Sequence, residues 1–162
     1  MNTSKVVKQM PFDLSQTIAD SENIARFIFS PINVNPTSNK LKPNCLKPPT
    51  GLDEVSVNRF DYTDENFLKS TGLQMQNPKK LFYGLAIMRA KNIRDNNFDI
   101  VYSPIKYSNI YHSDIKIGYF VEKDVELPAE ISAKIRNILN ETKLFVDKDT
   151  SQSIWVGDEI KL

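Results

Sequence analysis

Cysteine and histidine are nearly missing from this chain, which has one of each, Cys45 and His112, in 162 residues. A single cysteine cannot form an intrachain disulfide, and this usage is typical of a reducing compartment, so we expect a cytoplasmic protein. One histidine and one cysteine cannot supply the several ligands of a zinc site, which excludes zinc hydrolases. We expect Cys45 to be a small hydrophobic residue of the core rather than a nucleophile.

Glycine and long apolar runs are also scarce. The five glycines are scattered singly along the chain, whereas a P-loop or a dinucleotide-binding turn needs several glycines together so that backbone amides can approach phosphate. No apolar run is long enough to span a bilayer, and the N-terminal segment contains no signal-peptide core. We therefore expect no membrane partner.

Charge of one sign is not in excess, because 21 lysines and arginines face 20 aspartates and glutamates, for a net charge of +1. The chain as a whole thus has no strong attraction for nucleic acid or anionic lipid, and such a partner would need a local patch. A hydrophobic share of 40% and a charged share of 25% are usual for a globular domain. We predict a flexible or pairing N-terminal arm over residues 1–17 and one domain over residues 18–162.

Strand signals recur along the chain. Residues 55–60 alternate apolar and polar side chains, which is the period of a strand with one buried face. Residues 24–29 fit a strand or a short helix equally. Four other short apolar segments are also predicted to be strands: residues 98–102, 115–120, 144–146 and 154–156.

Helix signals are fewer. Thr63 before two acids predicts the start of a short helix that ends at Gly72, and Pro128 predicts the start of another helix. Residues 78–95 have helical spacing, so we predict a helix there, with a strand as the alternative. Residues 31–51 carry five prolines and should form a long loop with extended pieces. The sum is a single α+β domain, with a mostly antiparallel or mixed sheet of five to six strands and two to three helices.

The densest polar stretch, residues 107–114, is predicted to be a loop between two strands, and it holds the only histidine. The ordinary pKa of histidine lies near neutral, so His112 is the first candidate for proton transfer, with Asp114 or Tyr111 to orient it. The alternative is that His112 sits at a strand end and bonds a backbone carbonyl.

A second pattern overlaps this stretch. Asp99 on one predicted strand, followed by Asp114 and Lys116 near the next, matches the outline of a metal-dependent nuclease core. In such a core two carboxylates hold Mg²⁺ and a lysine stabilises developing charge. Mg²⁺ belongs to this alternative only, and we otherwise expect no cofactor. The competing interpretation is that these residues are exposed charges at a strand edge.

Arginines interrupt two strand-like runs, at Arg26 and Arg59. An arginine in such a position must reach solvent or meet an anion. With Lys40, Lys42 and Lys47 of the proline-rich loop, the two arginines are predicted to form a cationic pocket for phosphate or a nucleic-acid backbone. The alternative is that the lysines only solvate the surface.

Five short segments carry a resemblance: Ile24–Ser30, Leu41–Pro43, Val55–Arg59, Phe98–Val101 and His112–Ile115. They resemble a group of small uncharacterised prokaryotic proteins met in mobile-element and phage-defence neighbourhoods. The resemblance implies a bacterial defence component and brings no established activity. It also implies that four side chains face one site, namely Arg26, Ser56, Arg59 and His112.

The leading hypothesis is an accessory binding module that recognises an anionic ligand or a protein partner. Its predicted ligand-binding residues are Arg26, Ser56, Arg59, Lys42 and Tyr111, beside the loop over residues 31–51. The alternative is a small enzyme acting on nucleotides or nucleic acid, either the nuclease outlined above or a transferase using Arg26, Ser56 and His112. A third hypothesis is a component of a larger assembly, with its contact near Trp155.

Overall fold

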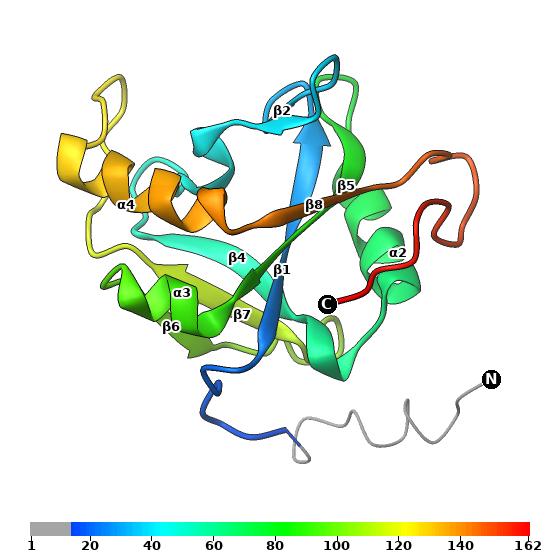
Figure 1. Cartoon of the computed structure of the whole chain (residues 1–162), viewed down its shortest axis with the longest axis horizontal. Helices are drawn as coiled ribbons and strands as arrows, with labels where there is room; N and C mark the ends of the chain where they lie inside the picture. The colour runs from blue at the N-terminus through cyan, green and yellow to red at the C-terminus, as the bar shows by residue number, and fades with distance from the viewer. Residues whose placement is uncertain (1–13) are drawn as a thin grey trace.

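The computed structural model describes residues 14–162, which form a six-stranded antiparallel sheet with three α-helices (Figure 1). The strand order is β6-β7-β4-β1-β5-β8. The six strands are β1 (Asn23–Ser30), β4 (Glu54–Arg59), β5 (Leu81–Arg89), β6 (Asp99–Tyr102), β7 (His112–Lys116) and β8 (Lys143–Val146). The helices are α2 (Glu65–Met75), α3 (Ala90–Asp95) and α4 (Ala129–Asn140). The predicted α+β class is confirmed.

The sheet is apolar on both faces at its centre. Alternate side chains of a strand point to opposite faces, so Ile24 and Ile28 of β1 join the larger core with α3 and α4, while Phe27 and Phe29 join the smaller core with α2. The helices therefore cover opposite sides of the sheet (Figure 1). A strand buried on both faces satisfies helical as well as strand spacing, which explains why the period of residues 24–29 is ambiguous.

The same physics overturns the helix predicted over residues 78–95. That segment forms strand β5 followed by the short helix α3. β5 lies between β1 and β8 and is buried along most of its length, so its continuous apolar run carries no clear period. A Cβ at Gly84 would overlap the carbonyl oxygen of Phe145, so this glycine lets β8 approach β5 closely.

Gly72 does not end its helix as predicted, because α2 continues to Met75. A Cβ at Gly72 would lie 2.5 Å from the ring of Phe82, so the glycine is needed for close packing of the helix on the sheet. The helix begins one residue later than expected, with the Asp64 side chain accepting a hydrogen bond from the Phe67 amide at 2.9 Å.

Two further segments differ from prediction. Residues 154–156 are not a strand; their backbone instead bonds outside the sheet, where the Trp155 amide donates to Asn66 Oδ1 at 2.8 Å. Strand β7 covers residues 112–116, so His112 and Asp114 lie on a strand rather than in the predicted loop. The strands over residues 55–60, 98–102 and 144–146 are confirmed to within one residue.

The proline-rich segment, residues 31–51, is not wholly irregular. It contains the two-residue strands β2 (Val34–Asn35) and β3 (Lys40–Leu41), and then the 3-10 helix η2 (Pro43–Leu46). Cys45 is fully buried in η2 within the larger core, as predicted. The predicted N-terminal arm lies largely outside the described residues.

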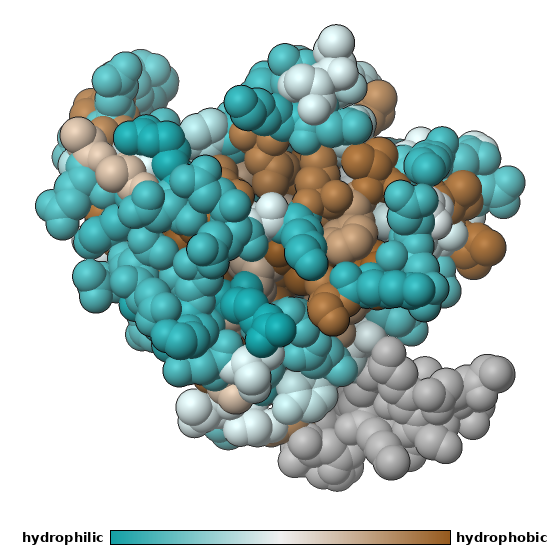
Figure 2. Space-filling view, in the orientation of Figure 1, coloured by the Kyte–Doolittle hydropathy of each residue, from teal (hydrophilic) through white to brown (hydrophobic). Residues whose placement is uncertain are grey.

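Two buried ion pairs hold the segment before β1 and the segment after β8 against the rest of the fold. Arg59 binds Glu22, and Lys69 on α2 binds Asp147, with both cations completely buried. The surface in Figure 2 is mostly hydrophilic over α3 and α4 and apolar between β8 and α2. Over residues 14–162 we find no helix with the length and apolar character needed to cross a bilayer.

Candidate functional site

Arg26 lies on β1, on the face of the sheet that carries the larger core. Its Nε donates a hydrogen bond to the Cys45 carbonyl at 2.8 Å, and its Nη1 donates to the Ser56 carbonyl at 2.9 Å. β1 pairs with β4 only at Ile24 and Ala25. Where the two strands separate, the Arg26 guanidinium donates a hydrogen bond to a β4 carbonyl. Arg26 thus ties η2 to the sheet, and burial lowers the pKa of Arg26.

The charge of Arg26 meets no carboxylate among residues 14–162. Its Nη2 donates no hydrogen bond to the described residues. Nη2 is also not one of the side-chain atoms that are buried without a hydrogen-bond partner. Arg26 is half-buried, so part of this residue is exposed to solvent. A partly buried cation that lacks a counter-ion is stabilised by an anion that binds beside it.

The proline-rich segment above Arg26 adds positive charge. It contains three lysines and no aspartate or glutamate. None of these lysines forms an ion pair within the described part of the chain. Lys42 donates its Nζ to the Pro31 carbonyl at 2.8 Å, and its own carbonyl accepts from the Cys45 amide at 3.0 Å. Lys42 and Arg26 are therefore joined through the backbone of η2.

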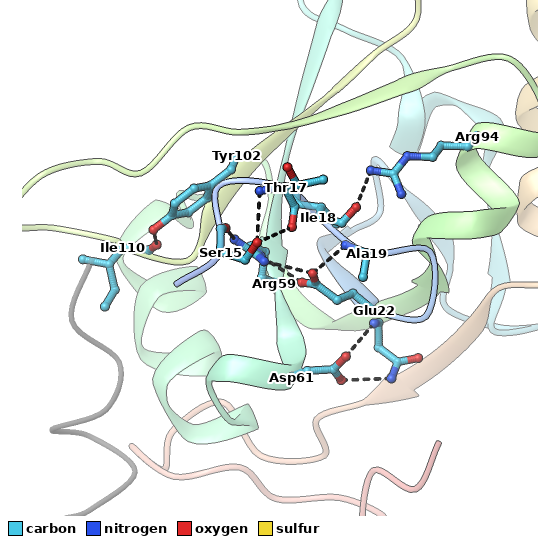
Figure 3. Close-up of polar contacts among 11 residues, drawn as sticks. Ser15, Thr17, Ile18, Ala19, Glu22, Arg59, Asp61, Arg94, Tyr102 and Ile110 are labelled. Atoms are coloured by element: carbon cyan, nitrogen blue, oxygen red, sulfur yellow. Dashed lines mark hydrogen bonds and ion pairs between the residues drawn. The ribbon is translucent and has the colours of Figure 1, made fainter. Parts of the chain in front are cut away.

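All three side-chain nitrogens of Arg59 donate hydrogen bonds inside the protein (Figure 3). Its Nε and Nη2 bind both oxygens of Glu22 at 2.8 and 2.9 Å, and Nη1 donates to the Ser15 carbonyl at 2.6 Å. The rings of Tyr62 and Tyr102 lie 4.7 and 4.8 Å from the guanidinium carbon. Arg59 is fully buried, so it holds residues 15–22 on the sheet and offers no donor to a ligand.

His112 and Asp114 lie two residues apart on β7, on the face opposite the larger core. Ser103, at the end of β6, joins them: its Oγ donates to Asp114 Oδ2 at 2.6 Å and lies 3.1 Å from His112 Nδ1. His112 Nδ1 is also 2.9 Å from the Ser103 carbonyl. A carbonyl can only accept, so Nδ1 carries a proton, while Nε2 lies 4.0 Å from Asp114 Oδ1.

This arrangement is not that of an activated serine. A histidine that draws a proton from serine needs an unprotonated nitrogen facing the hydroxyl, whereas here the protonated Nδ1 faces Ser103. The contact between His112 and a backbone carbonyl matches the structural alternative raised from the sequence. The Tyr111 ring packs on Phe67 with the ring centroids 5.1 Å apart, and burial raises the pKa of Tyr111.

The expectation that Arg26, Arg59 and His112 face one site is wrong. The β1–β4 and β4–β7 registers align Ala25, Asn58 and His112 across one face. Arg26 directly follows Ala25, and Arg59 directly follows Asn58. The two arginine side chains therefore point to the other face of the sheet. Ser56 pairs with Asp114, so its side chain lies on the face of His112, and only its backbone carbonyl accepts a hydrogen bond from Arg26.

The three residues of the nuclease outline do share a face. Asp99 pairs with Lys116 across β6 and β7, and Asp114 is two residues from Lys116 on the same strand. Lys116 Nζ lies 3.1 Å from Glu54 and 3.9 Å from Asp53, and the Glu54 carboxylate raises the pKa of Lys116. In the described portion of the chain, no three histidine, cysteine, aspartate or glutamate side chains gather as a metal-binding group.

Sequence reasoning missed Ser103, because nothing local distinguishes it from other loop serines. Only the pairing of β6 with β7 brings it to Asp114. Searches against protein-family models, curated proteins and solved structures return no match to this chain. Geometry alone therefore supports the functional argument.

Proposed function

We propose that this protein is a binding module for a small anionic ligand of the phosphate or nucleotide type. The ligand meets the free edge of Arg26, and Lys42 supplies a second positive charge. The observation that carries the proposal is that the half-buried Arg26 has no carboxylate partner within residues 14–162 and that its Nη2 donates no hydrogen bond to those residues. A planar guanidinium matches the oxygens of a phosphate, with charge-assisted hydrogen bonds.

A small ligand suits this surface better than a nucleic-acid backbone. The net charge of +1 provides no long-range attraction for a polyanion, and the candidate site offers only Arg26 and the three lysines of residues 31–51. The cytoplasmic location and the phage-defence setting belong to the same proposal. Cell fractionation and identification of co-purifying proteins test these two points.

Calorimetric titration with inorganic phosphate and with AMP, at low ionic strength, tests the binding. We expect binding by the wild type that weakens about tenfold or more in Lys42→Ala and in Arg26→Lys, because each loses a charge-assisted contact. Lys79→Ala is the matched control, since Lys79 is exposed and forms no ion pair among the described residues. No heat from the wild type, or equal weakening in Lys79→Ala, overturns the proposal.

A second candidate function is the Mg²⁺-dependent nuclease, favoured because Asp99, Asp114 and Lys116 lie on one face of neighbouring strands. Its two carboxylates would hold the ion, which would supply the charge stabilisation that phosphodiester cleavage needs. Incubation with labelled DNA and RNA, with and without Mg²⁺, tests this function. Cleavage that requires Mg²⁺ and disappears in Asp114→Asn supports it, and wild-type cleavage no greater than that of Asp114→Asn removes it.

A further inference from the structure

A cavity of about 340 Å³ opens where η2 meets α4. Asn44 and Lys47 lie on the η2 side, and Glu126 and Ser132 lie on the α4 side. Pro43, Leu127 and Ile135 supply the apolar part of its lining, and Leu127 packs against the larger core. Cavities of this size that combine an apolar surface with a few polar groups are typical of small-molecule sites.

The cavity carries one charge of each sign. Lys47 and Glu126 both line it, yet they form no ion pair with each other or with any other residue among 14–162. Opposite charges that line one cavity without contact leave room for a ligand that carries both signs. Lys47 also lines an adjoining cavity with Lys123 and the three acids Glu122, Asp124 and Glu126. This excess of acids keeps the surroundings of Lys47 unfavourable for a polyanion.

Two neutral groups complete the lining. Asn44 donates its Nδ2 to the Ile32 carbonyl at 2.8 Å, which leaves its side-chain oxygen to accept from a ligand. The Ser132 amide donates to the Pro128 carbonyl at 3.0 Å, at the start of α4. The Ser132 hydroxyl has no partner among the described residues. Both groups suit an ammonium or a carboxylate better than an apolar group.

We infer that this cavity binds a free amino acid with an aliphatic side chain. Lys47 takes the carboxylate, Glu126 takes the ammonium, and the side chain rests on Leu127 and Ile135. The inference goes beyond the anion-binding proposal and does not depend on it, because phosphate has no ammonium for Glu126 and the cavity does not include Arg26. A fatty acid leaves Glu126 unpaired, and an amine leaves Lys47 unpaired.

The test is a calorimetric titration of the full chain with L-leucine, leucinamide and 4-methylpentanoate. Leucinamide lacks the carboxylate and 4-methylpentanoate lacks the ammonium, so each should bind about tenfold or more weakly than leucine. Equal binding of leucine and either analogue overturns the inference, and so does the absence of leucine binding.

Variants locate the site. Lys47→Met and Glu126→Gln should each weaken leucine binding about tenfold or more, whereas the controls Lys79→Met and Glu159→Gln should leave it unchanged. Glu159 is 78% exposed, so its replacement tests charge without disturbing the core. Leucine binding that survives Glu126→Gln overturns the inference. Phosphate binding lost in Lys42→Ala but kept in Glu126→Gln belongs to the other site, so the two proposals fail separately.

Discussion

Replacing Lys69 by methionine tests a fully buried ion pair of this fold. The Lys69 ammonium is completely buried and donates to Asp147 Oδ1 at 3.1 Å, to the Asp149 carbonyl at 2.8 Å and to the Ile154 carbonyl at 2.5 Å. All three acceptors lie in the segment that follows β8. Lys69→Met leaves the buried Asp147 carboxylate and two carbonyls without this donor, while it keeps the apolar stem.

Removing one partner of a buried ion pair costs about 3–5 kcal/mol, because the other charge remains buried without compensation. Small domains are stable by about 5–15 kcal/mol, so Lys69→Met should remove a large part of the free energy of unfolding. Asp147→Asn should also destabilise the protein. In the wild type the Val156 amide donates to Asp147 Oδ1 at 2.8 Å, and the asparagine keeps an oxygen that can accept this hydrogen bond. The double variant should lose less than the sum of the two single variants, because neither charge is then left alone.

Urea unfolding measures these differences, followed at once by circular dichroism and by the fluorescence of Trp155, the only tryptophan. Trp155 lies in the segment that Lys69 fastens, and its amide donates to Asn66 of α2. Fluorescence that changes before the dichroism in Lys69→Met would show that the segment detaches first. A free energy of unfolding within about 0.5 kcal/mol of the wild type, the range of ordinary surface substitutions, would refute the reasoning.

Three other outcomes follow from buried groups. Glu22→Gln leaves the buried Arg59 guanidinium without its carboxylate, so thermal unfolding should show a loss of about 3 kcal/mol or more; a loss equal to that of the exposed Asp61→Asn would contradict this. Gly72→Ala places a methyl group against the Phe82 ring and should cost about 1–3 kcal/mol, measured by urea unfolding. Burial raises the pKa of Cys45 to about 12, so the native thiol should resist iodoacetamide until the chain unfolds. The unfolded thiol ionises near pH 8.5, so stability from this group is present below that pH and lost as pH rises toward 12; Cys45→Ala should remove that slope.

Local signals were sufficient for part of this fold. Alternation at residues 55–60 and the proline at 128 predicted β4 and the start of α4, because a half-exposed element shows its period in its own residues. β5 defeated the same reasoning because both of its faces are buried, so burial no longer alternates along the chain.

The site was less accessible to sequence reasoning than the fold. Arg26 and Arg59 look alike in the sequence, since each interrupts a strand-like run. Arg59 binds Glu22, 37 residues away, whereas Arg26 donates only to carbonyl oxygens. Which arginine keeps donors for a ligand depends on contacts between distant segments, which no local pattern records.

By itself, the sequence determined the α+β class, the burial of Cys45 and the absence of acids from residues 31–51, because these follow from composition and short-range spacing. Only the tertiary structure decided which charges lie together. The period of a strand divides its own side chains between two faces, but the register with its neighbours decides which side chains from other strands share each face. That register placed His112 with Asp114 and Ser103, and Arg26 on the opposite side of the sheet.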